Sequence, residues 1–185
     1  KIPILNAGDG TNEHPTQALL DLCIIKSIFK NKKIKIGICG DIKHSRVAHS
    51  NIKLLSKLNH EIHIIAPNYF LDKAELTKIN KKLVFHKSLS KLPKLDVIMM
   101  LRVQKERIQE NEKIDFEDYI KNYQLTNKVL KKSRDDLIVL HPMPINVGIE
   151  ISEYAIKDRK IKYLNQLSYA IPSRIAAFKY VKGEL

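Results

Sequence analysis

Short apolar runs and amphipathic stretches alternate along most of this chain. The apolar runs predict strands over residues 33–41, 61–66, 83–86, 96–101 and 136–140. Apolar residues at helical spacing predict helices over residues 45–58 and 72–80. This alternation is typical of an α/β fold with a doubly wound, mainly parallel sheet and helices on both faces. Ligands of such sheets bind beyond the carboxyl ends of the strands, so the loops that follow the strands are the expected place for a site.

The helix predicted over residues 15–29 has no single apolar stripe. Its apolar residues form two faces at helical spacing, Ala18, Leu22, Ile25 and Phe29 on one and Leu20, Ile24 and Ile28 on the other. A helix that is apolar nearly all round is buried on more than one side. We therefore expect this helix to lie between two packed bodies.

A second helical pattern ends the chain. Its apolar positions are Leu164, Leu167, Ile171, Ile175 and Phe178. Proline inside a helix removes a hydrogen bond and clashes with the preceding turn. The pattern therefore predicts a break near Pro172 and a final helix from there to about Lys182.

The segment between Arg102 and Leu130 is polar and charged, with a short helical pattern from Asp115 to Tyr123. A long polar segment inside a compact domain is usually a functional loop. We expect this one to act as a loop or lid over a site.

The net charge of +13 raises the question of a nucleic-acid partner. The lysines are spread over the whole length, aromatic residues make up only 6% of the chain, and no nucleic-acid-binding motif occurs. We therefore expect no nucleic-acid partner, although the charge would help to attract a small anionic substrate.

Neither a run of eighteen apolar residues nor a secretory signal pattern occurs, so we expect a cytoplasmic protein without a membrane partner. Cys23 and Cys39 lie in apolar runs without metal-ligand spacing, which is typical of buried free thiols.

Four polar strings follow predicted strands or open a helix. They are His14-Pro-Thr-Gln17, Gly40-Asp-Ile-Lys-His-Ser-Arg46, Leu101-Arg-Val-Gln-Lys-Glu-Arg107 and His141-Pro-Met-Pro144. Pro15 fits the first turn of a helix, which puts an imidazole and a carboxamide at its positive end. Arginine is the preferred partner of carboxylates because its planar fork can donate two hydrogen bonds. Together the strings predict a site for small anions.

The order and spacing of these strings resemble those of the aspartate carbamoyltransferases, from Asn6 to the final helix. Tyr163-Leu-Asn-Gln166 and Ser173-Arg-Ile-Ala176 extend the resemblance. Thr16 and Pro142 favour the aspartate enzymes over the ornithine enzymes, which typically carry cysteine at these points. The resemblance implies transfer of a carbamoyl group from carbamoyl phosphate to the amine of L-aspartate, giving N-carbamoyl-L-aspartate and phosphate for pyrimidine synthesis.

The resemblance also implies roles on the carbamoyl side of the reaction. His14 would donate to the carbamoyl carbonyl oxygen, and Gln17 with the backbone carbonyls of Pro142 and Met143 would hold the carbamoyl amide. Attack by the amine builds negative charge on that oxygen, and a preorganised donor stabilises it. This chemistry requires no metal and no organic cofactor.

On the aspartate side, the resemblance places Arg46, Arg102 and Gln104 on the substrate carboxylates. Arg107 would hold the closed form of the loop that follows residue 102. His141 is expected to orient its loop rather than to react.

The resemblance divides the chain into parts of a two-domain enzyme. Residues 1–30 would be the end of the carbamoyl-phosphate domain and the interdomain helix, 31–163 the aspartate-binding domain, and 164–185 a helix returning to the first domain. That domain normally carries a Ser-Thr-Arg-Thr-Arg phosphate loop, which does not occur in this sequence. We therefore expect a fragment that is inactive by itself, from an enzyme that forms a homotrimer.

Whether regulatory subunits or a multienzyme partner attach is left open by the sequence. The alternatives for function are a non-catalytic amino-acid-binding or interaction module derived from a carbamoyltransferase, and an ornithine-type carbamoyltransferase.

Overall fold

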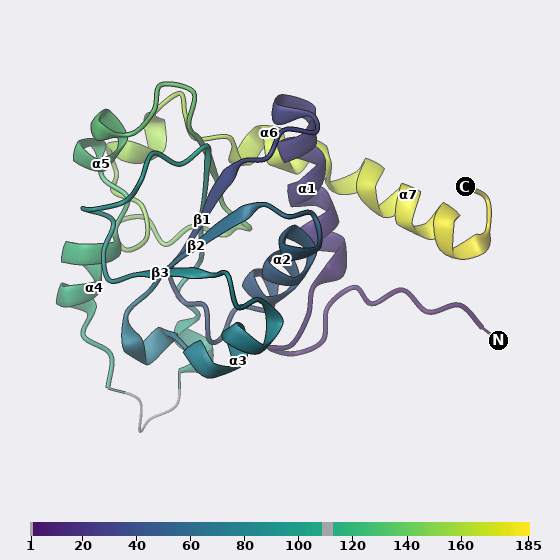
Figure 1. Ribbon diagram of the computed structural model, residues 1–185, viewed down its shortest axis with the longest axis horizontal. Helices are drawn as coiled ribbons and strands as arrows, with labels where there is room; N and C mark the ends of the chain where they lie inside the picture. Colours follow the sequence, from purple (N-terminus) through teal and green to yellow (C-terminus); the bar gives the residue numbers. More distant parts are fainter. Residues whose placement is uncertain (1, 109–112) are drawn as a thin grey trace.

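The computed structural model describes residues 2–108 and 113–185 and has a five-stranded sheet at its centre (Figure 1). The strands are β1 (Lys35–Cys39), β2 (Glu61–Ile65), β3 (Val84–His86), β4 (Val97–Met100) and β5 (Ile138–Leu140). All neighbours pair in parallel, in the order β3-β2-β1-β4-β5. The predicted strands and the doubly wound parallel sheet are confirmed, although each strand is shorter than its apolar run.

Both faces of the sheet are buried. Successive side chains of each strand point to opposite sides of the sheet, and each side lies in its own apolar cluster. Ile36 and Ile38 belong to one apolar cluster, whereas Cys39 belongs to another, together with Ile98 and Met100. Strands that are covered on both faces consist of continuous apolar residues, as these do.

Helices cover the two faces, as predicted (Figure 1). The first cluster includes residues of α1 (Pro15–Phe29), α2 (Arg46–Lys57) and α3 (Lys73–Ile79). The second includes residues of α4 (Phe116–Tyr123) and α5 (Asn127–Lys132), and of the 3₁₀ turns η1 (Asn68–Phe70) and η3 (Ala155–Lys157).

The helix expected between two packed bodies is α1, which packs against α2 and also against α6 (Tyr163–Ser168) and α7 (Ala170–Lys182). The break predicted near Pro172 lies at Tyr169 instead. Pro172 is then in the first turn of α7, where a missing N–H has no consequence for the helix. The helix therefore begins two residues before the proline.

Helix α7 and the N-terminal segment both extend away from the sheet and its helices (Figure 1). The five apolar residues predicted at helical spacing form a stripe on α6 and α7, and they are 47–72% exposed. We call this set the C-terminal stripe; it consists of Leu164, Leu167, Ile171, Ile175 and Phe178. A row of large exposed apolar side chains indicates a surface that another body covers.

Part of the polar segment between β4 and β5 lies outside the described residues, at 109–112. The helical pattern from Asp115 to Tyr123 is confirmed as α4, with the Asp115 side chain accepting from the N–H of Asp118 as an N-cap. A further 3₁₀ turn, η2 (Lys105–Arg107), follows β4.

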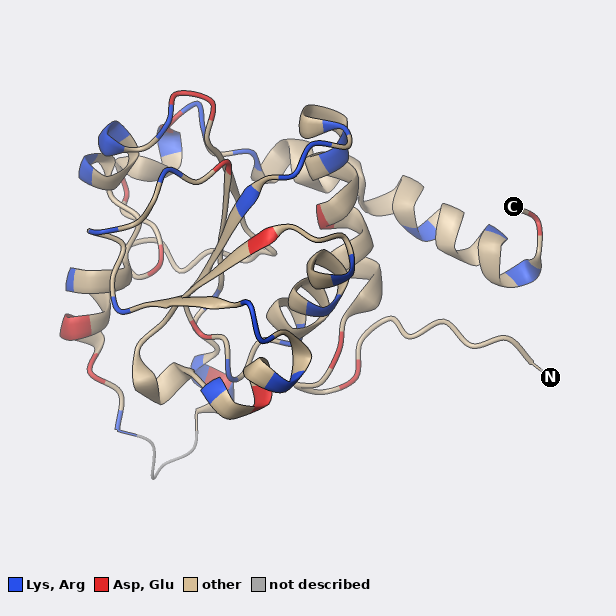
Figure 2. Ribbon diagram, viewed as in Figure 1, with Lys and Arg blue, Asp and Glu red and all other residues tan. Residues whose placement is uncertain are grey.

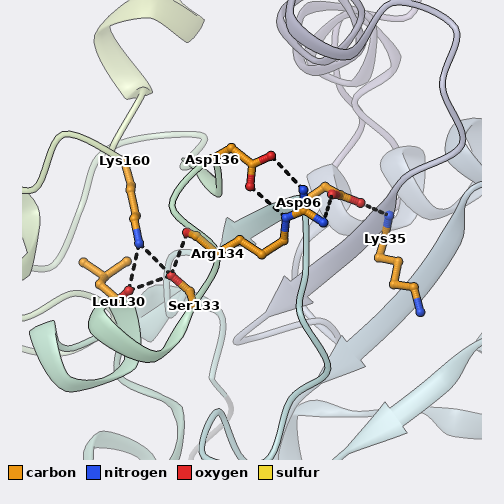
Figure 3. A network of polar contacts seen from close by, with 7 residues as sticks. All are labelled: Lys35, Asp96, Leu130, Ser133, Arg134, Asp136 and Lys160. Atoms are coloured by element: carbon orange, nitrogen blue, oxygen red, sulfur yellow. Dashed lines mark hydrogen bonds and ion pairs between the residues drawn. The ribbon is translucent and has the colours of Figure 1, made fainter.

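Charged side chains join the amino ends of three strands (Figure 3). Asp96, just before β4, accepts from the backbone N–H of Lys35 at 2.8 Å and pairs with Arg134 at 3.4 Å. Arg134 also forms two hydrogen bonds of 2.7 Å with Asp136, just before β5. This network lies at the end of the sheet opposite to the loops that carry the predicted site residues.

We expect Asp96→Ala to lower the free energy of unfolding by about 1 kcal/mol, since it removes one hydrogen bond and one partly exposed ion pair. Urea denaturation followed by circular dichroism measures this loss. The kinetics of the full-length enzyme should not change, and altered substrate affinity would contradict a purely structural role.

Lysines and arginines occur in helices, strands and loops throughout the fold (Figure 2). Cys39 is buried and Cys23 half-buried, and neither forms a disulfide. Among the described residues, no helix has the length and apolar character that crossing a membrane requires.

Candidate functional site at the carboxyl ends of the strands

A cavity of about 240 Å³ lies at the carboxyl ends of β1, β4 and β5. Its lining includes every site residue that the sequence predicted, and these are His14, Gln17, Arg46, Arg102, Gln104, Arg107, Pro142 and Met143. Strands β1 and β4 are the neighbours at which the strand order reverses, which is where doubly wound sheets bind ligands. We call this space the site cavity.

His14 is the N-cap residue of α1, directly before Pro15. Its backbone N–H donates to the Ser50 hydroxyl at 2.9 Å, and its Nδ1 lies 3.4 Å from the Thr16 hydroxyl. Burial, together with the nearby charges of Arg46 and Arg174, lowers the pKa of His14 below its usual value. The imidazole is therefore neutral at pH 7. In the tautomer in which Nδ1 accepts from the Thr16 hydroxyl, the ring proton is on Nε2.

Gln17 is buried in the first turn of α1, and its orientation is fixed by a carboxylate. Its Nε2 donates to Oδ1 of Asp21 at 2.9 Å. Within the part of the chain that the structure describes, its Oε1 has no hydrogen-bond partner. The side chain therefore brings a free acceptor to the wall of the site cavity.

The turn between β1 and α2 brings Arg46 to the site cavity. Gly40 allows this turn, since it has a φ of +127° and a Cβ there would lie 3.1 Å from the carbonyl oxygen of Leu101. Ser45 caps α2 by accepting from the N–H of Ala48. The guanidinium of Arg46 packs on Gly8, where an added Cβ would come within 2.8 Å of Nη1.

Asp41 ties the β1 turn to the loop after β4. It is fully buried and accepts from the backbone N–H of His44 at 3.1 Å and from that of Gln104 at 3.2 Å. Arg107 adds a second link, donating from Nη1 to the carbonyl oxygen of His44 at 2.8 Å. Arg107 thus holds its loop onto the β1 turn in this structure.

The loop after β4 presents Arg102 to the site cavity. Its guanidinium forms a two-pronged ion pair with Glu106, with Nη1 on Oε1 and Nη2 on Oε2. Its Nε is buried and has no partner among the described residues. A buried donor without an acceptor is costly, so this N–H is available to an anion in the cavity.

The loop after β5 is held by His141. The ring Nδ1 of His141 accepts from the backbone N–H of Met143 at 2.9 Å. The backbone N–H of His141 donates to Oε1 of Gln166 at 3.0 Å. Burial, assisted by the charge of Arg102, lowers the pKa of His141 to about 3, so this ring is neutral. Met143 has a φ of +58°, a backbone conformation that a side chain of this size rarely adopts and that is often found at functional sites.

Several supporting residues were not identified from the sequence. Glu106 and Val47 line the site cavity, and the buried Glu150 ties the β4 loop to the β5 loop. Glu150 accepts from the N–H of Val103 and from both the backbone and the side-chain nitrogen of Asn146, each at 2.7 Å. A sequence signal existed, because Glu150 stands between two isoleucines and a charge in an apolar run needs buried partners.

The fold is of the doubly wound α/β class, with a cavity lined by three arginines where its strand order reverses. A family model described as "Aspartate/ornithine carbamoyltransferase, Asp/Orn binding domain" matches residues 32–181. The chain belongs to this family.

Curated relatives include aspartate carbamoyltransferase catalytic subunits. The one from Ehrlichia ruminantium (strain Gardel) is 42% identical over 96% of this chain and 59% of its own length. The one from Koribacter versatilis is 43% identical over 95% of this chain and 58% of its own. The chain thus spans less than two thirds of these relatives.

Solved structures with this fold include the catalytic subunit of M. jannaschii aspartate transcarbamoylase. It has a TM-score of 0.79 and 33% identity, over all of this chain and 60% of that one. The Trypanosoma cruzi aspartate transcarbamoylase in complex with N-(phosphonacetyl)-L-aspartic acid has a TM-score of 0.80 and 31% identity. This second match covers 94% of this chain and 57% of that structure.

Proposed function

We propose that this chain is the aspartate-binding part of an aspartate carbamoyltransferase. The enzyme would transfer the carbamoyl group of carbamoyl phosphate to the amine of L-aspartate. The observation that carries the proposal is the site cavity, which unites three arginines with a neutral histidine and a free amide oxygen. The Trypanosoma cruzi relative has been solved with carbamoyl phosphate and aspartate together, which supports the same substrates here.

The proposed aspartate side consists of Arg46, Arg102 and Gln104. A dicarboxylate needs at least two cationic partners, and planar guanidinium groups bind carboxylates with two parallel hydrogen bonds. The buried Nε of Arg102 supports this assignment, since it lacks an acceptor among the described residues. Arg107 would help to hold the loop after β4 in its closed position.

The proposed carbamoyl side consists of His14, Gln17 and the carbonyl groups of Pro142 and Met143. When the aspartate amine attacks, the carbonyl oxygen of the carbamoyl group gains negative charge. The neutral His14 ring would donate its Nε2 proton to that oxygen by a hydrogen bond, without transferring it. The acceptors would hold the carbamoyl nitrogen, so that the carbonyl carbon faces the amine at near-attack distance.

We propose further that a carbamoyl-phosphate domain covers the C-terminal stripe. Residues 1–30 would end that domain and connect it, residues 31–163 would bind aspartate, and residues 164–185 would return to it. The exposure of the stripe and the extended course of α7 and the N-terminal segment support this arrangement (Figure 1). By likeness to the family, the working enzyme would be a cytoplasmic homotrimer, and the question of regulatory subunits stays open.

The experiment that tests the function compares two proteins in an assay for N-carbamoyl-L-aspartate. The 185-residue chain alone should form no product, because it lacks the Ser-Thr-Arg-Thr-Arg phosphate loop of the family. The full-length protein, or this chain joined to the carbamoyl-phosphate domain of a relative, should be active with aspartate and not with ornithine. An inactive full-length protein would instead favour a non-catalytic binding module.

Exposure of the C-terminal stripe predicts the behaviour of the isolated chain. It should bind a hydrophobic dye and self-associate, since several large apolar side chains of α6 and α7 lie in water. Replacing Ile171 and Phe178 by serine should reduce both effects without lowering the melting temperature. A monomeric chain without dye binding would contradict a covered surface.

A further inference from the structure

One buried carboxylate connects the two sides of the proposed carbamoyl subsite. Asp21 is fully buried in α1, one helical turn beyond Gln17. Its Oδ1 accepts from Nε2 of Gln17 at 2.9 Å and from Nε2 of Gln166 at 2.6 Å. Its Oδ2 accepts from Nδ2 of Asn51 at 2.7 Å.

The first of these contacts decides which end of the Gln17 amide faces the site cavity. A side-chain amide offers donors on its nitrogen and an acceptor on its oxygen. Burial raises the pKa of Asp21 to about 6, so in mildly alkaline solution the carboxylate is ionised and can only accept. The Gln17 nitrogen is therefore bound to Asp21, and the oxygen is left for a ligand that donates.

The second contact reaches the opposite side of the subsite. Gln166 is held by Asp21 through its nitrogen, and its Oε1 accepts from the N–H of His141. His141 in turn accepts from the N–H of Met143. This chain of hydrogen bonds fixes the course of the loop that carries Pro142 and Met143, whose carbonyl groups are the other proposed acceptors of the subsite.

We propose that Asp21 is a positioning residue that makes the subsite selective for an acyl phosphate bearing an amide nitrogen. Through Gln17 on one side and Gln166 on the other, it sets acceptors around the place of that nitrogen. An acyl phosphate with a methyl group in place of the amide nitrogen has no donor there, so it forms no hydrogen bonds with these acceptors. The proposal rests on the proposed function and adds to it the origin of carbamoyl selectivity.

The test uses the full-length enzyme and two ligands that differ only at this point. Carbamoyl phosphate is the substrate, and acetyl phosphate, with a methyl in place of the amide nitrogen, is the competitor. Asp21→Ala should lower kcat/KM for carbamoyl phosphate at least tenfold, whereas the inhibition constant of acetyl phosphate should change less than threefold. General damage to the site would weaken the binding of both ligands alike. A loss in kcat/KM for carbamoyl phosphate that exceeds the change in the inhibition constant of acetyl phosphate therefore indicates positioning.

A matched control is Asn51→Ala, which removes the partner of Oδ2 and leaves both glutamines on Oδ1. It should change neither constant more than threefold. Gln166→Met is a milder second variant of similar size, which keeps the link between Asp21 and Gln17. It should lower kcat/KM for carbamoyl phosphate at least fivefold without weakening acetyl phosphate, and it carries the test if Asp21→Ala does not fold.

Equal losses for both ligands, or no loss in either variant, would overturn the role of Asp21. Circular dichroism melting of each variant identifies a loss that comes from unfolding. Lack of carbamoyl transfer by the unmodified enzyme is a different result, because it would reject the proposed function itself.

Discussion

Replacing His14 with alanine in the full-length enzyme should lower kcat by roughly a hundredfold or more, because preorganised donors to a developing oxyanion have effects of this size. The ring is neutral and sits at the positive end of α1, with its Nδ1 facing the Thr16 hydroxyl. Its donor acts mainly on charge that develops during attack. The affinity for carbamoyl phosphate should therefore fall much less than kcat.

Steady-state kinetics with both substrates measures the loss in kcat and the loss in affinity for carbamoyl phosphate separately. Thr16→Val is the matched control, since it removes the contact with Nδ1 and leaves the ring in place. It should lower kcat only a few-fold. Near-normal turnover of His14→Ala would reduce His14 to the N-cap of α1.

Arg102→Ala should raise the KM for aspartate by about 10- to 150-fold, because a hydrogen bond to a charged group is worth about 1.5–3 kcal/mol. The arginine is held against Glu106 with a buried Nε left over, so it is oriented before the substrate binds. Affinity for carbamoyl phosphate should change less than threefold. Isothermal titration and initial-rate kinetics measure the two effects separately.

Arg134→Ala is the matched control for charge, since Arg134 is an exposed arginine at the opposite end of the sheet. Arg134→Ala should change neither the KM for aspartate nor the affinity for carbamoyl phosphate; Figure 3 shows the contacts that this substitution removes. Unchanged aspartate kinetics in Arg102→Ala would remove this residue from the proposed aspartate side. A similar loss in both variants would mean that net charge, and not a specific contact, attracts the substrate.

Three fully buried carboxylates hold the loops of the site cavity together. Asp21 joins the start of α1 to α6, Asp41 joins the β1 turn to the β4 loop, and Glu150 joins the β4 loop to the β5 loop. Each accepts backbone or amide hydrogens, which offsets the cost of burying its charge. This framework holds together loops that are far apart in the sequence. The arginines of the site cavity are therefore held in place before a substrate binds.

The sequence by itself determined the elements and the residues of the candidate site. Strand and helix periods are local signals, so β1 to β5 and α1 to α4 lie where the pattern predicted them, whereas the six-residue helix α5 was not predicted. The polar strings follow strand ends, and parallel strands bring their carboxyl ends to one edge. The grouping of Arg46, Arg102 and Met143 around one cavity could therefore be expected, while their roles remain predictions.

Only the tertiary structure decided which polar groups meet and how each is oriented. Asp21 and Gln166 are 145 positions apart, and no local period reports a hydrogen bond over that distance. The pairing of Arg102 with Glu106 and the free oxygen of Gln17 depend on side-chain geometry that spacing does not contain. The helix break at Tyr169 was misplaced from sequence for a similar reason, because proline is compatible with a first turn as well as with a break. In the folded chain, the packing of α1 against α2, α6 and α7 decides that Pro172 lies in the first turn of α7 and not at the break.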